Sequence, residues 1–428
     1  MMRDAMKYSK FMNLRKANFL RNYELNNFAF LHLYRENKLI FILIIFFLPG
    51  IIYSQNYNDK IKVGAERTEE YLPVIKDKNI AVVANQTSMV GNVHLVDTLL
   101  SLGIKIKKVF APEHGFRGMA DAGEHVKNSK DKKTGLSLIS LYGNNKKPKP
   151  KDLKGIDVVI FDIQDVGVRF YTYISTMHYM MEACAEQKKQ IIILDRPNPN
   201  GFFVDGPVLK KEFQSFVGMH PIPLVHGLTI GELAQMINRE NWLQNGIHCD
   251  LKIISCENYS HQDFYELPVK PSPNLPNMLS VYFYPSLGLF EGTVVSVGRG
   301  TEKPFQIIGH PDLKKADYKF TPKSTAGAKN PPYENQECSG FDLSVLSEEE
   351  IRSCKKIYLN WLLGTFSNSD KEKFFLKNNF FNLLAGNTEL MQQITEGKTE
   401  KEIRKSWQSD LEKYKLLRKK YLLYEDFE

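Results

Sequence analysis

Short apolar runs separated by stretches of helical periodicity make up the chain between residues 79 and 256. An apolar run bounded by polar residues is typical of a strand buried on both faces of a parallel sheet. Apolar positions repeated at helical spacing predict the helices that connect such strands. Strands are predicted at 79–85, 104–110, 136–141, 155–162, 190–195 and 249–256, with helices at 93–102, 173–187 and after Thr229. This alternation predicts an α/β fold, a doubly wound parallel sheet with right-handed crossovers.

The pattern changes at Pro271, where glycine and proline become frequent and the apolar runs shorten. This change predicts a second, mixed α/β domain with strongly helical stretches at 347–366 and 379–423. The predicted boundaries are 55–280 for the sheet domain and 281–428 for the C-terminal auxiliary domain. Residues 119–135 and the lysine-rich segment 144–155 are expected to be irregular surface structure. One helical stripe indicates core packing, and it consists of Ile394, Ile403, Trp407, Leu411 and Tyr414.

A leader of 54 residues precedes the sheet and contains the apolar run Leu39–Tyr53. Arg35 and Lys38 lie before the run and Ser54 follows it, which is the arrangement of a secretory signal. The run is shorter than the roughly 20 residues of a membrane-spanning helix. The leader therefore predicts export to the periplasm with cleavage after Ser54, and an uncleaved anchor is the alternative.

The formal charge of +8 belongs mostly to this leader, which holds eight basic and three acidic residues. Removing it leaves 49 basic and 46 acidic residues, which is not the charge of a nucleic-acid-binding protein. A hydrophobic content of 43% with 25% charged residues is that of a globular protein with a sizeable core. The five cysteines lack CxxC spacing and, in a chain this long, predict buried free thiols instead of a disulfide scaffold.

Three of the predicted strands end in clusters of charged and amide side chains. The segment 109–118, VFAPEHGFRG, places a carboxylate, an imidazole and a guanidinium close together at a strand end. Because the carboxyl ends of parallel strands share one edge, where open α/β sheets bind ligands, the clusters predict a site there. A solvated loop is the alternative for 109–118, and backbone anchoring is the alternative for Asp162 and Asp165. The clusters are Glu113 and His114, then Asp162, Asp165 and Arg169, then Asp195, Arg196 and Asn198.

Several common chemistries have no motif in the sequence. There is no GxGxxG or GxxxxGK[ST] to hold a dinucleotide or a nucleoside triphosphate. There is no GxSxG nucleophile elbow, and the histidines lack HxxxH spacing. These absences argue against serine hydrolases and zinc enzymes, so no metal and no cofactor is predicted.

The mixture of carboxylates, amides, cations and aromatic rings at this edge is typical of sugar recognition. Glycoside cleavage requires a proton donor beside the leaving oxygen and a second group as base, nucleophile or stabiliser. Glu113 fits the first role if a second domain covers its loop, and Asp162 or Asp165 fits the second. Thr229 and Glu232 form a capping-box pattern, with ligand contact as the alternative for Glu232.

Several long motifs together resemble the NamZ-type exo-β-N-acetylmuramidases, a glycoside hydrolase family long classed as a domain of unknown function. The resemblance covers roughly residues 78–342. It implies a Rossmann-like catalytic domain, a C-terminal auxiliary domain, and a cleft that releases N-acetylmuramic acid from the non-reducing ends of peptidoglycan fragments. The motifs are APEHGFRG, GIDVVIFDIQDVGVRFYTYISTM, LDRPNPNG, PIPLVHGLTIGELA, PSPNLPN and LFEGTVVSVGRGTEKPFQIIGHP.

The glutamate of the family's PEHG motif falls on Glu113, which the resemblance implies to be the general acid/base. The implied catalytic set is Glu113, His114, Asp165 and Tyr173. The implied substrate-binding set is Arg169, Tyr171, Asn198, His226, Asn274, Glu291, Arg299 and Glu302. Arg169 or Arg299 could bind the lactyl carboxylate of the sugar through the guanidinium fork.

The expected partners are peptidoglycan-derived saccharides, with no nucleic acid and no stable protein partner implied. Two rival functions remain open at this point. One is a non-catalytic protein that binds cell-wall sugars, and the other is an esterase or amidase that acts on wall material.

Overall fold

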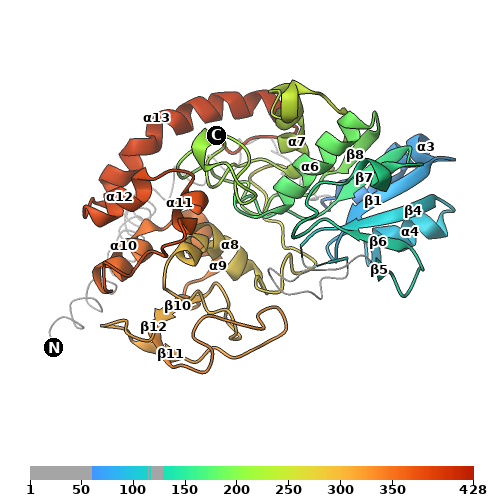
Figure 1. Ribbon diagram of the computed structural model, residues 1–428. Helices are drawn as coiled ribbons and strands as arrows, with labels where there is room; N and C mark the ends of the chain where they lie inside the picture. Colours follow the sequence, from blue (N-terminus) through green and yellow to red (C-terminus); the bar gives the residue numbers. More distant parts are fainter. Residues whose placement is uncertain (1–59, 114, 117–128) are drawn as a thin grey trace, which may run out of the picture. The chain divides into compact units, whose positions relative to one another are not determined.

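The computed structural model describes residues 60–113, 115–116 and 129–428 (Figure 1). The predicted signal peptide, His114 and Arg117 therefore lie outside the described residues. Residues 60–428 form one compact unit. No helix in the described ranges is long and apolar enough to cross a membrane.

A seven-stranded sheet lies at the centre of the N-terminal half, in the order β5-β6-β4-β1-β7-β8-β9. Neighbouring strands run parallel except β5, which pairs antiparallel with β6. The chain extends the sheet on one side of β1 through β4 and β6, then returns to place β7, β8 and β9 on the other side. All six predicted strands are present, and the doubly wound, Rossmann-like fold is confirmed. The strands are β1 (Asn79–Ala84), β4 (Lys105–Ala111), β5 (Ser129–Lys130), β6 (Ser137–Ser140), β7 (Val158–Asp162), β8 (Gln190–Leu194) and β9 (Asp250–Ile254).

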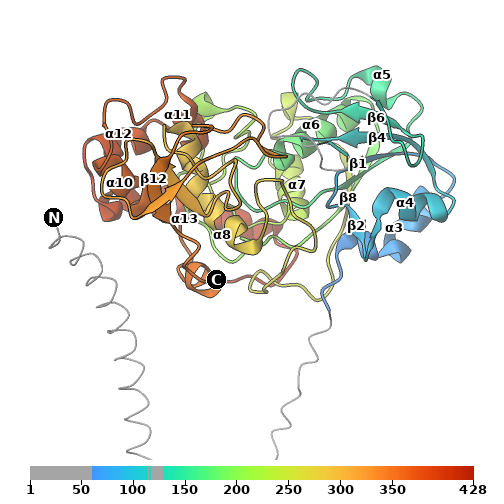
Figure 2. The ribbon, with the colours of Figure 1, turned by 90° about the horizontal axis from the view of Figure 1, so that it is seen from below.

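Both faces of the sheet are covered by helices, which explains why its strands are apolar throughout. Alternate residues of β1 belong to two different hydrophobic clusters, Ala81 and Val83 to one and Ile80 and Val82 to the other. One face packs against α3 (Thr68–Ile75) and α4 (Leu95–Ser101), and the opposite face against α6 (Tyr173–Glu186) and α7 (Ile230–Arg239) (Figure 2).

Some local details differ from the sequence predictions. The predicted helix at 93–102 begins at Leu95, because Val93–His94 forms β3, which pairs with β2 (Met89–Val90), and the His94 ring caps the helix by accepting from Val96 N. The lysine-rich segment 144–155 contains the short helix α5 (Pro150–Leu153), which has proline at its first position.

The C-terminal half combines helices with a three-stranded antiparallel sheet, ordered β10-β12-β11. The predicted helical stretch 347–366 is broken at Lys355, and 379–423 is broken at Gly386, where φ is positive in each case. The elements are α8 (Met278–Leu287), β10 (Ile307–His310), β11 (Tyr318–Phe320), β12 (Cys338–Asp342), α9 (Glu348–Ser353), α10 (Leu359–Ser367), α11 (Phe380–Ala385), α12 (Glu389–Thr395) and α13 (Glu400–Arg418).

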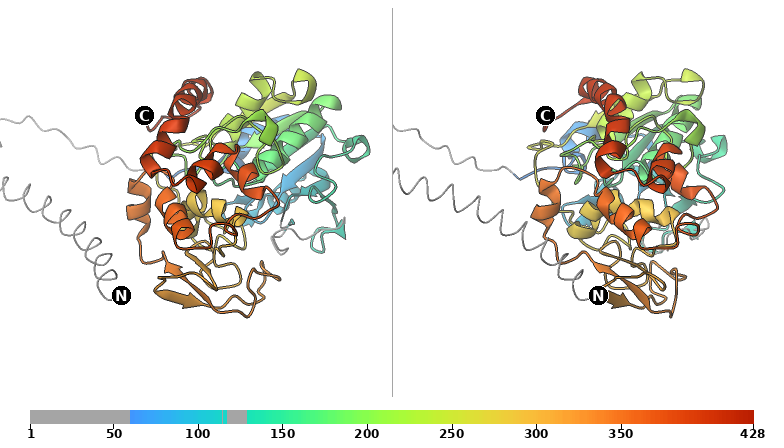
Figure 3. Two further views of the ribbon diagram at one scale, coloured as in Figure 1. Left: turned by 60° about the vertical axis from the view of Figure 1, so that its left-hand side comes forward. Right: turned by 90° about the vertical axis from the view of Figure 1, so that its left-hand side faces the viewer.

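One hydrophobic cluster extends across the predicted boundary at 280/281. The side chains of the predicted stripe, from Ile394 to Tyr414, are buried in the same cluster as α6 and α7. Figure 3 shows the orange and red C-terminal helices beside the green segments of the sheet half. Four of the five cysteines are buried free thiols, and Cys354 is partly exposed.

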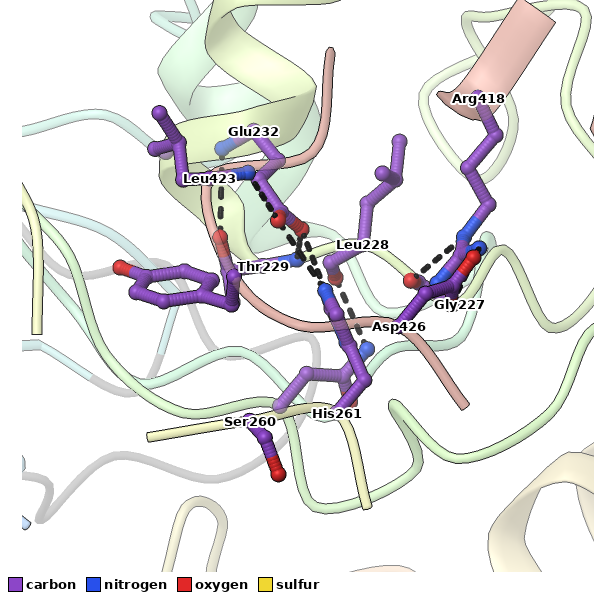
Figure 4. Close-up of polar contacts among 12 residues, drawn as sticks. Gly227, Leu228, Thr229, Glu232, Ser260, His261, Arg418, Leu423 and Asp426 are labelled. Carbon is purple, nitrogen blue, oxygen red and sulfur yellow. Dashed lines mark hydrogen bonds and ion pairs between the residues drawn. The ribbon is translucent and has the colours of Figure 1, made fainter. Parts of the chain in front are cut away.

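The last ten residues return from α13 to the sheet half and are held there by buried polar contacts (Figure 4). Arg418 is fully buried; its Nε donates to the Gly227 carbonyl, and its Nη1 contacts both carboxylate oxygens of Asp426 at 2.9 Å. The backbone N–H of Leu423 donates to Glu232 Oε1 at 2.8 Å. These last ten residues, the tail, thus supply one hydrogen-bond donor to the carboxylate of Glu232 on α7.

Tyr424 extends the same tail to the end of β8. Its hydroxyl donates to Asp195 Oδ2 at 2.6 Å and accepts from the Cys256 N–H at 2.9 Å. Burial raises the pKa of Asp195 to about 6, although the bonds from Tyr424 and Thr229 oppose this rise. The tyrosine hydroxyl therefore partly offsets the desolvation of a carboxyl group that has no exposure to water.

Replacing Tyr424 with phenylalanine should destabilise the protein by about 1–3 kcal/mol, because two buried groups lose a hydrogen-bond partner. Urea unfolding of the wild type and the variant measures this difference in the free energy of unfolding. Tyr318→Phe, on the partly exposed strand β11, is the matched control and should change the free energy by less than about 0.5 kcal/mol. Equal stability of Tyr424→Phe and the wild type would contradict a stabilising role for the tail.

Candidate active site

The candidate site lies at the carboxyl edge of the sheet, where the direction of winding reverses around β1. Open α/β sheets bind ligands in the crevice at such a point. Strand β4 ends at Ala111, two residues before Glu113, and β7 ends at Asp162, three residues before Asp165. β4 and β7 pair with β1 from its two sides. Glu113 and Asp165 therefore follow strands that are separated only by β1, at the same edge of the sheet.

Glu113 is partly buried and contacts the beginning of helix α6. The Thr172 hydroxyl donates to Glu113 Oε2 at 3.0 Å. Tyr173 is the first residue of α6; burial raises the pKa of its hydroxyl, and the nearby charge of Glu113 raises it further. Glu113, two residues after β4, therefore lies against the start of α6.

Tyr171, Tyr173 and Tyr284, which come from both halves of the molecule, pack against one another next to the start of α6. We call these three residues the aromatic wall. The ring of Tyr171 lies 4.9 Å from that of Tyr173 and 5.8 Å from that of Tyr284, edge to face in each case. The hydroxyls of Tyr171 and Tyr173 are directed at the Pro271 carbonyl, at 2.8 and 3.5 Å. Burial raises the pKa of all three hydroxyls, so they remain protonated donors at neutral pH.

Asp165 is the second carboxyl group that follows a strand end, and it is buried. Its Oδ2 accepts the Gly167 N–H at 2.7 Å and lies 3.8 Å from His226 Nε2, while its Oδ1 is buried without a hydrogen-bond partner. Desolvation raises the pKa of Asp165 to about 7. Desolvation also lowers the pKa of His226 to about 3, and its Nδ1 accepts from Leu228 N, so the ring is neutral. His226 is thus a neutral neighbour of the Asp165 carboxyl group.

The C-terminal half contributes the ion pair of Arg299 and Glu291 to the candidate site. Arg299 Nε and Nη2 both donate to Glu291 Oε1, at 2.9 and 2.7 Å. About a quarter of the Glu291 side chain (25%) and a fifth of the Arg299 side chain (21%) remain exposed. The guanidinium lies 5.1 Å from the ring of Phe305, and the carboxylates of Glu291 and Glu113 both help to raise its pKa. Phe305 packs edge to face against Tyr284, so the ion pair adjoins the aromatic wall.

Arg169, expected to bind substrate, is instead fully buried and holds the two halves of the molecule together. Its Nη1 donates to two carbonyl oxygens of the sheet half, and its Nη2 donates to two carbonyl oxygens at the end of α11, all within 2.9 Å. The four acceptors belong to Pro207, Ile222, Leu384 and Ala385. We assign Arg169 a structural role, because these bonds occupy both terminal nitrogens of its guanidinium.

Several other polar residues at the strand ends also serve the fold. Both oxygens of Asp162 are bound by Arg196, at 2.6 and 2.9 Å, and neither side chain has more than 2% exposure. Asp195 accepts from Thr229 and from the Gly231 N–H. Of the two aspartates for which backbone anchoring was the alternative, Asp165 accepts the Gly167 N–H, whereas Asp162 binds the side chain of Arg196.

Glu232 combines the predicted capping box with the contacts to the tail. Its Oε2 accepts the Thr229 N–H at 2.8 Å, and the His261 ring contacts it at 3.0 Å. Because the side chain has no exposure, capping and packing account for Glu232 without a ligand.

The remaining predicted residues differ in their surroundings. The Asn198 amide bonds the Leu228 carbonyl and the Asn200 N–H, and the Asn274 amide bonds the Gly327 carbonyl. Glu302 is exposed, and His114 lies outside the described residues. The structure thus brings together Glu113, Asp165, Tyr171, Tyr173, Glu291 and Arg299.

Thr172 and Tyr284 belong to the site but were missed in the sequence. Thr172 lies inside a motif noted above, and its hydroxyl has no special spacing that would distinguish it. Tyr284 lies in the apolar helix α8, where a tyrosine is indistinguishable from a core residue. Within residues 60–113, 115–116 and 129–428, no group of three or more His, Cys, Asp or Glu side chains is placed to hold a metal ion.

Comparison with known proteins identifies relatives over most of the chain. The sequence model of the N-terminal part of exo-β-N-acetylmuramidase NamZ matches residues 80–279, and that of its C-terminal part matches residues 282–424. The peptidoglycan β-N-acetylmuramidase NamZ of Bacillus subtilis (strain 168) is 38% identical over 387 residues, covering 85% of this chain and 92% of that protein.

Two solved structures of DUF1343 family proteins from Bacteroides fragilis NCTC 9343 are also similar. One is 49% identical with a TM-score of 0.80, and the comparison covers 86% of this chain and 99% of the other. The second is 29% identical with a TM-score of 0.69, over 85% and 99% of the two chains.

Proposed function

The chain belongs to the exo-β-N-acetylmuramidase NamZ family of glycosidases, and from this membership we propose that it releases N-acetylmuramic acid from the non-reducing ends of peptidoglycan fragments. The observation that carries the proposal is the position of Glu113 at the sheet edge, where it contacts Thr172 at the start of α6, next to the aromatic wall that includes Tyr284 from the other half.

In this proposal, Glu113 donates the proton to the leaving oxygen and later takes one back from water. Thr172 fixes one oxygen of its carboxyl group, so the other is oriented as well. The hydroxyls of Tyr171 and Tyr173, which donate to the Pro271 carbonyl, can still accept hydrogen bonds from sugar hydroxyls. Partial burial excludes bulk water from the acid, which strengthens its electrostatic interactions with the substrate.

Arg299 is the better of the two arginines for the lactyl carboxylate. Its Nη1 takes no part in the two bonds to Glu291, and part of its side chain is accessible. A guanidinium nitrogen can donate a charge-assisted hydrogen bond to a carboxylate.

Replacing Arg299 with glutamine should weaken the binding of free N-acetylmuramic acid by about 10- to 150-fold, the equivalent of one charged hydrogen bond. Binding of N-acetylglucosamine, which lacks the lactyl group, should change much less. Calorimetric titration with both sugars measures the two dissociation constants. Arg239→Gln, on the exposed end of α7, is the control. Equal weakening for both sugars would contradict the assignment.

The activity itself is tested by incubating the protein with a disaccharide in which N-acetylmuramic acid is β-linked to N-acetylglucosamine. The proposal requires that both monosaccharides appear in equal amounts by mass spectrometry. Binding without any product after prolonged incubation would favour a sugar-binding protein. Loss of an acyl or amide group with the glycosidic bond intact would favour an esterase or amidase.

We also propose that the protein is exported to the periplasm, on the strength of the apolar run Leu39–Tyr53 and its basic flank. Cell fractionation followed by N-terminal sequencing tests this. A mature chain that begins at Gln55 is expected, and recovery of the intact leader in the soluble cytosolic fraction would refute export.

A further inference from the structure

Acid-catalysed glycoside cleavage needs a second group at the anomeric carbon, and most glycosidases use a carboxylate there. Three aspartates at the carboxyl edge of the sheet are the obvious candidates, but each is committed to the fold. Asp162 has both oxygens bound by Arg196, and Asp195 is bound by Thr229, Gly231 and Tyr424. Asp165 is 4% exposed, with Oδ2 held by a backbone N–H and Oδ1 shielded from solvent.

Glu291 differs from these aspartates because it is both held in place and accessible. It lies on the short helix η4 (Gly288–Gly292), which follows α8, and a quarter of its side chain is exposed. Both bonds from Arg299 go to Oε1. Oε2 therefore remains outside the ion pair, on a carboxylate that the guanidinium orients.

A series of contacts connects Glu291 with Glu113. Arg299, which binds Glu291, lies 5.1 Å from the ring of Phe305, and that ring lies 5.1 Å from the ring of Tyr284. Tyr284 packs against Tyr171, and the next residue, Thr172, donates to Glu113. Two partly exposed carboxylates, one from each half of the molecule, are thus linked through the aromatic wall.

We propose that Glu291 is the second catalytic carboxylate, and that its Oε2 attacks the anomeric carbon on the face opposite the leaving group. This inference rests on the proposed glycosidase function. Oε2 forms a bond to C1 while the C1–O bond to the aglycone breaks, and the leaving oxygen takes the electron pair and the proton of Glu113. Water then attacks C1, gives a proton to Glu113, and displaces Oε2, which restores both side chains.

The test compares Glu291→Ala with the wild type on an aryl β-N-acetylmuraminide, with and without azide. The variant should lose at least 100-fold in kcat, and azide, which fits the space of the lost carboxylate, should restore turnover and yield the α-glycosyl azide. Glu349→Ala, on the exposed surface of α9, is the control and should match the wild type. Urea unfolding should show a change within about 1 kcal/mol, because the lost ion pair is partly exposed.

The outcomes separate this inference from the proposed function. If the wild type releases no sugar from any muraminide, the glycosidase function itself fails. If the wild type is active and Glu291→Ala keeps more than a tenth of its kcat, the assignment of Glu291 is wrong. Proton NMR of the wild-type reaction should show the β-anomer first, and initial release of the α-anomer would overturn the covalent step.

Discussion

Replacing Glu113 with glutamine should lower kcat on muraminides with poor leaving groups by about 10²- to 10⁴-fold, the usual contribution of a general acid. Glutamine preserves the shape of the side chain and can still accept the hydrogen bond from Thr172, but it cannot donate a proton to the glycosidic oxygen. The measurement is steady-state hydrolysis of the N-acetylmuramic acid–N-acetylglucosamine disaccharide by the variant and the wild type.

The leaving group provides an internal control for this prediction. A dinitrophenyl aglycone departs without protonation, so Glu113→Gln should lose much less activity in the cleavage step with that substrate. Glu349→Gln, on the exposed surface of α9, should behave as the wild type with both substrates. Near wild-type turnover of the disaccharide by a folded Glu113→Gln variant would show that another group donates the proton.

Replacing Arg169 with methionine should destabilise the protein by about 3–5 kcal/mol, because several buried carbonyl oxygens lose a donor at about 1–3 kcal/mol each. The carbonyl oxygens of Pro207, Leu384 and Ala385 would lose the donor that Arg169 supplies, and that of Ile222 would keep only the Leu209 N–H. Two of these oxygens end helix α11, where carbonyl groups lack partners within the helix. Gly386 follows them with φ of 82°, and a Cβ there would lie 2.6 Å from Arg169 Nη2.

Arg299→Met is the matched comparison, because Arg299 is partly exposed and its partner is one carboxylate. Urea unfolding should place Arg299→Met within about 1 kcal/mol of the wild type. Activity assays should show the reverse order once both variants are measured under folding conditions, with Arg299→Met the more impaired per folded molecule. A stable Arg169→Met variant with impaired sugar binding would return Arg169 to the substrate site.

The strands of the sheet could be predicted because each depends on a local pattern. Val158–Asp162 is apolar at successive positions, and burial on both faces requires that pattern wherever the strand lies. The ends of the strands were harder, because a charged residue after a strand serves equally well as a ligand group or as an anchor. Asp162 and Glu113 both lie at or just after the end of a strand, yet Arg196 binds the first and Thr172 contacts the second.

Arg169 and Tyr284 show what sequence alone could not decide. Arg169 binds the carbonyls of residues more than 200 positions away, and a carbonyl oxygen has no sequence signature. Tyr284 looks like a core residue of an apolar helix until α8 is packed against the tyrosines that follow β7. Both roles depend on long-range packing between the two halves of the chain.

The anchored tail also determines when the protein can finish folding. Domains fold as their residues leave the ribosome, N-terminal parts first. Asp195 and Glu232 belong to the half that is made first, and Tyr424 and Leu423, which donate to them, follow 229 and 191 residues later. A nascent chain can therefore assemble its sheet early and still carry two incompletely bonded acids until Leu423 and Tyr424 have been made. A truncation before Leu423 would leave that defect permanent.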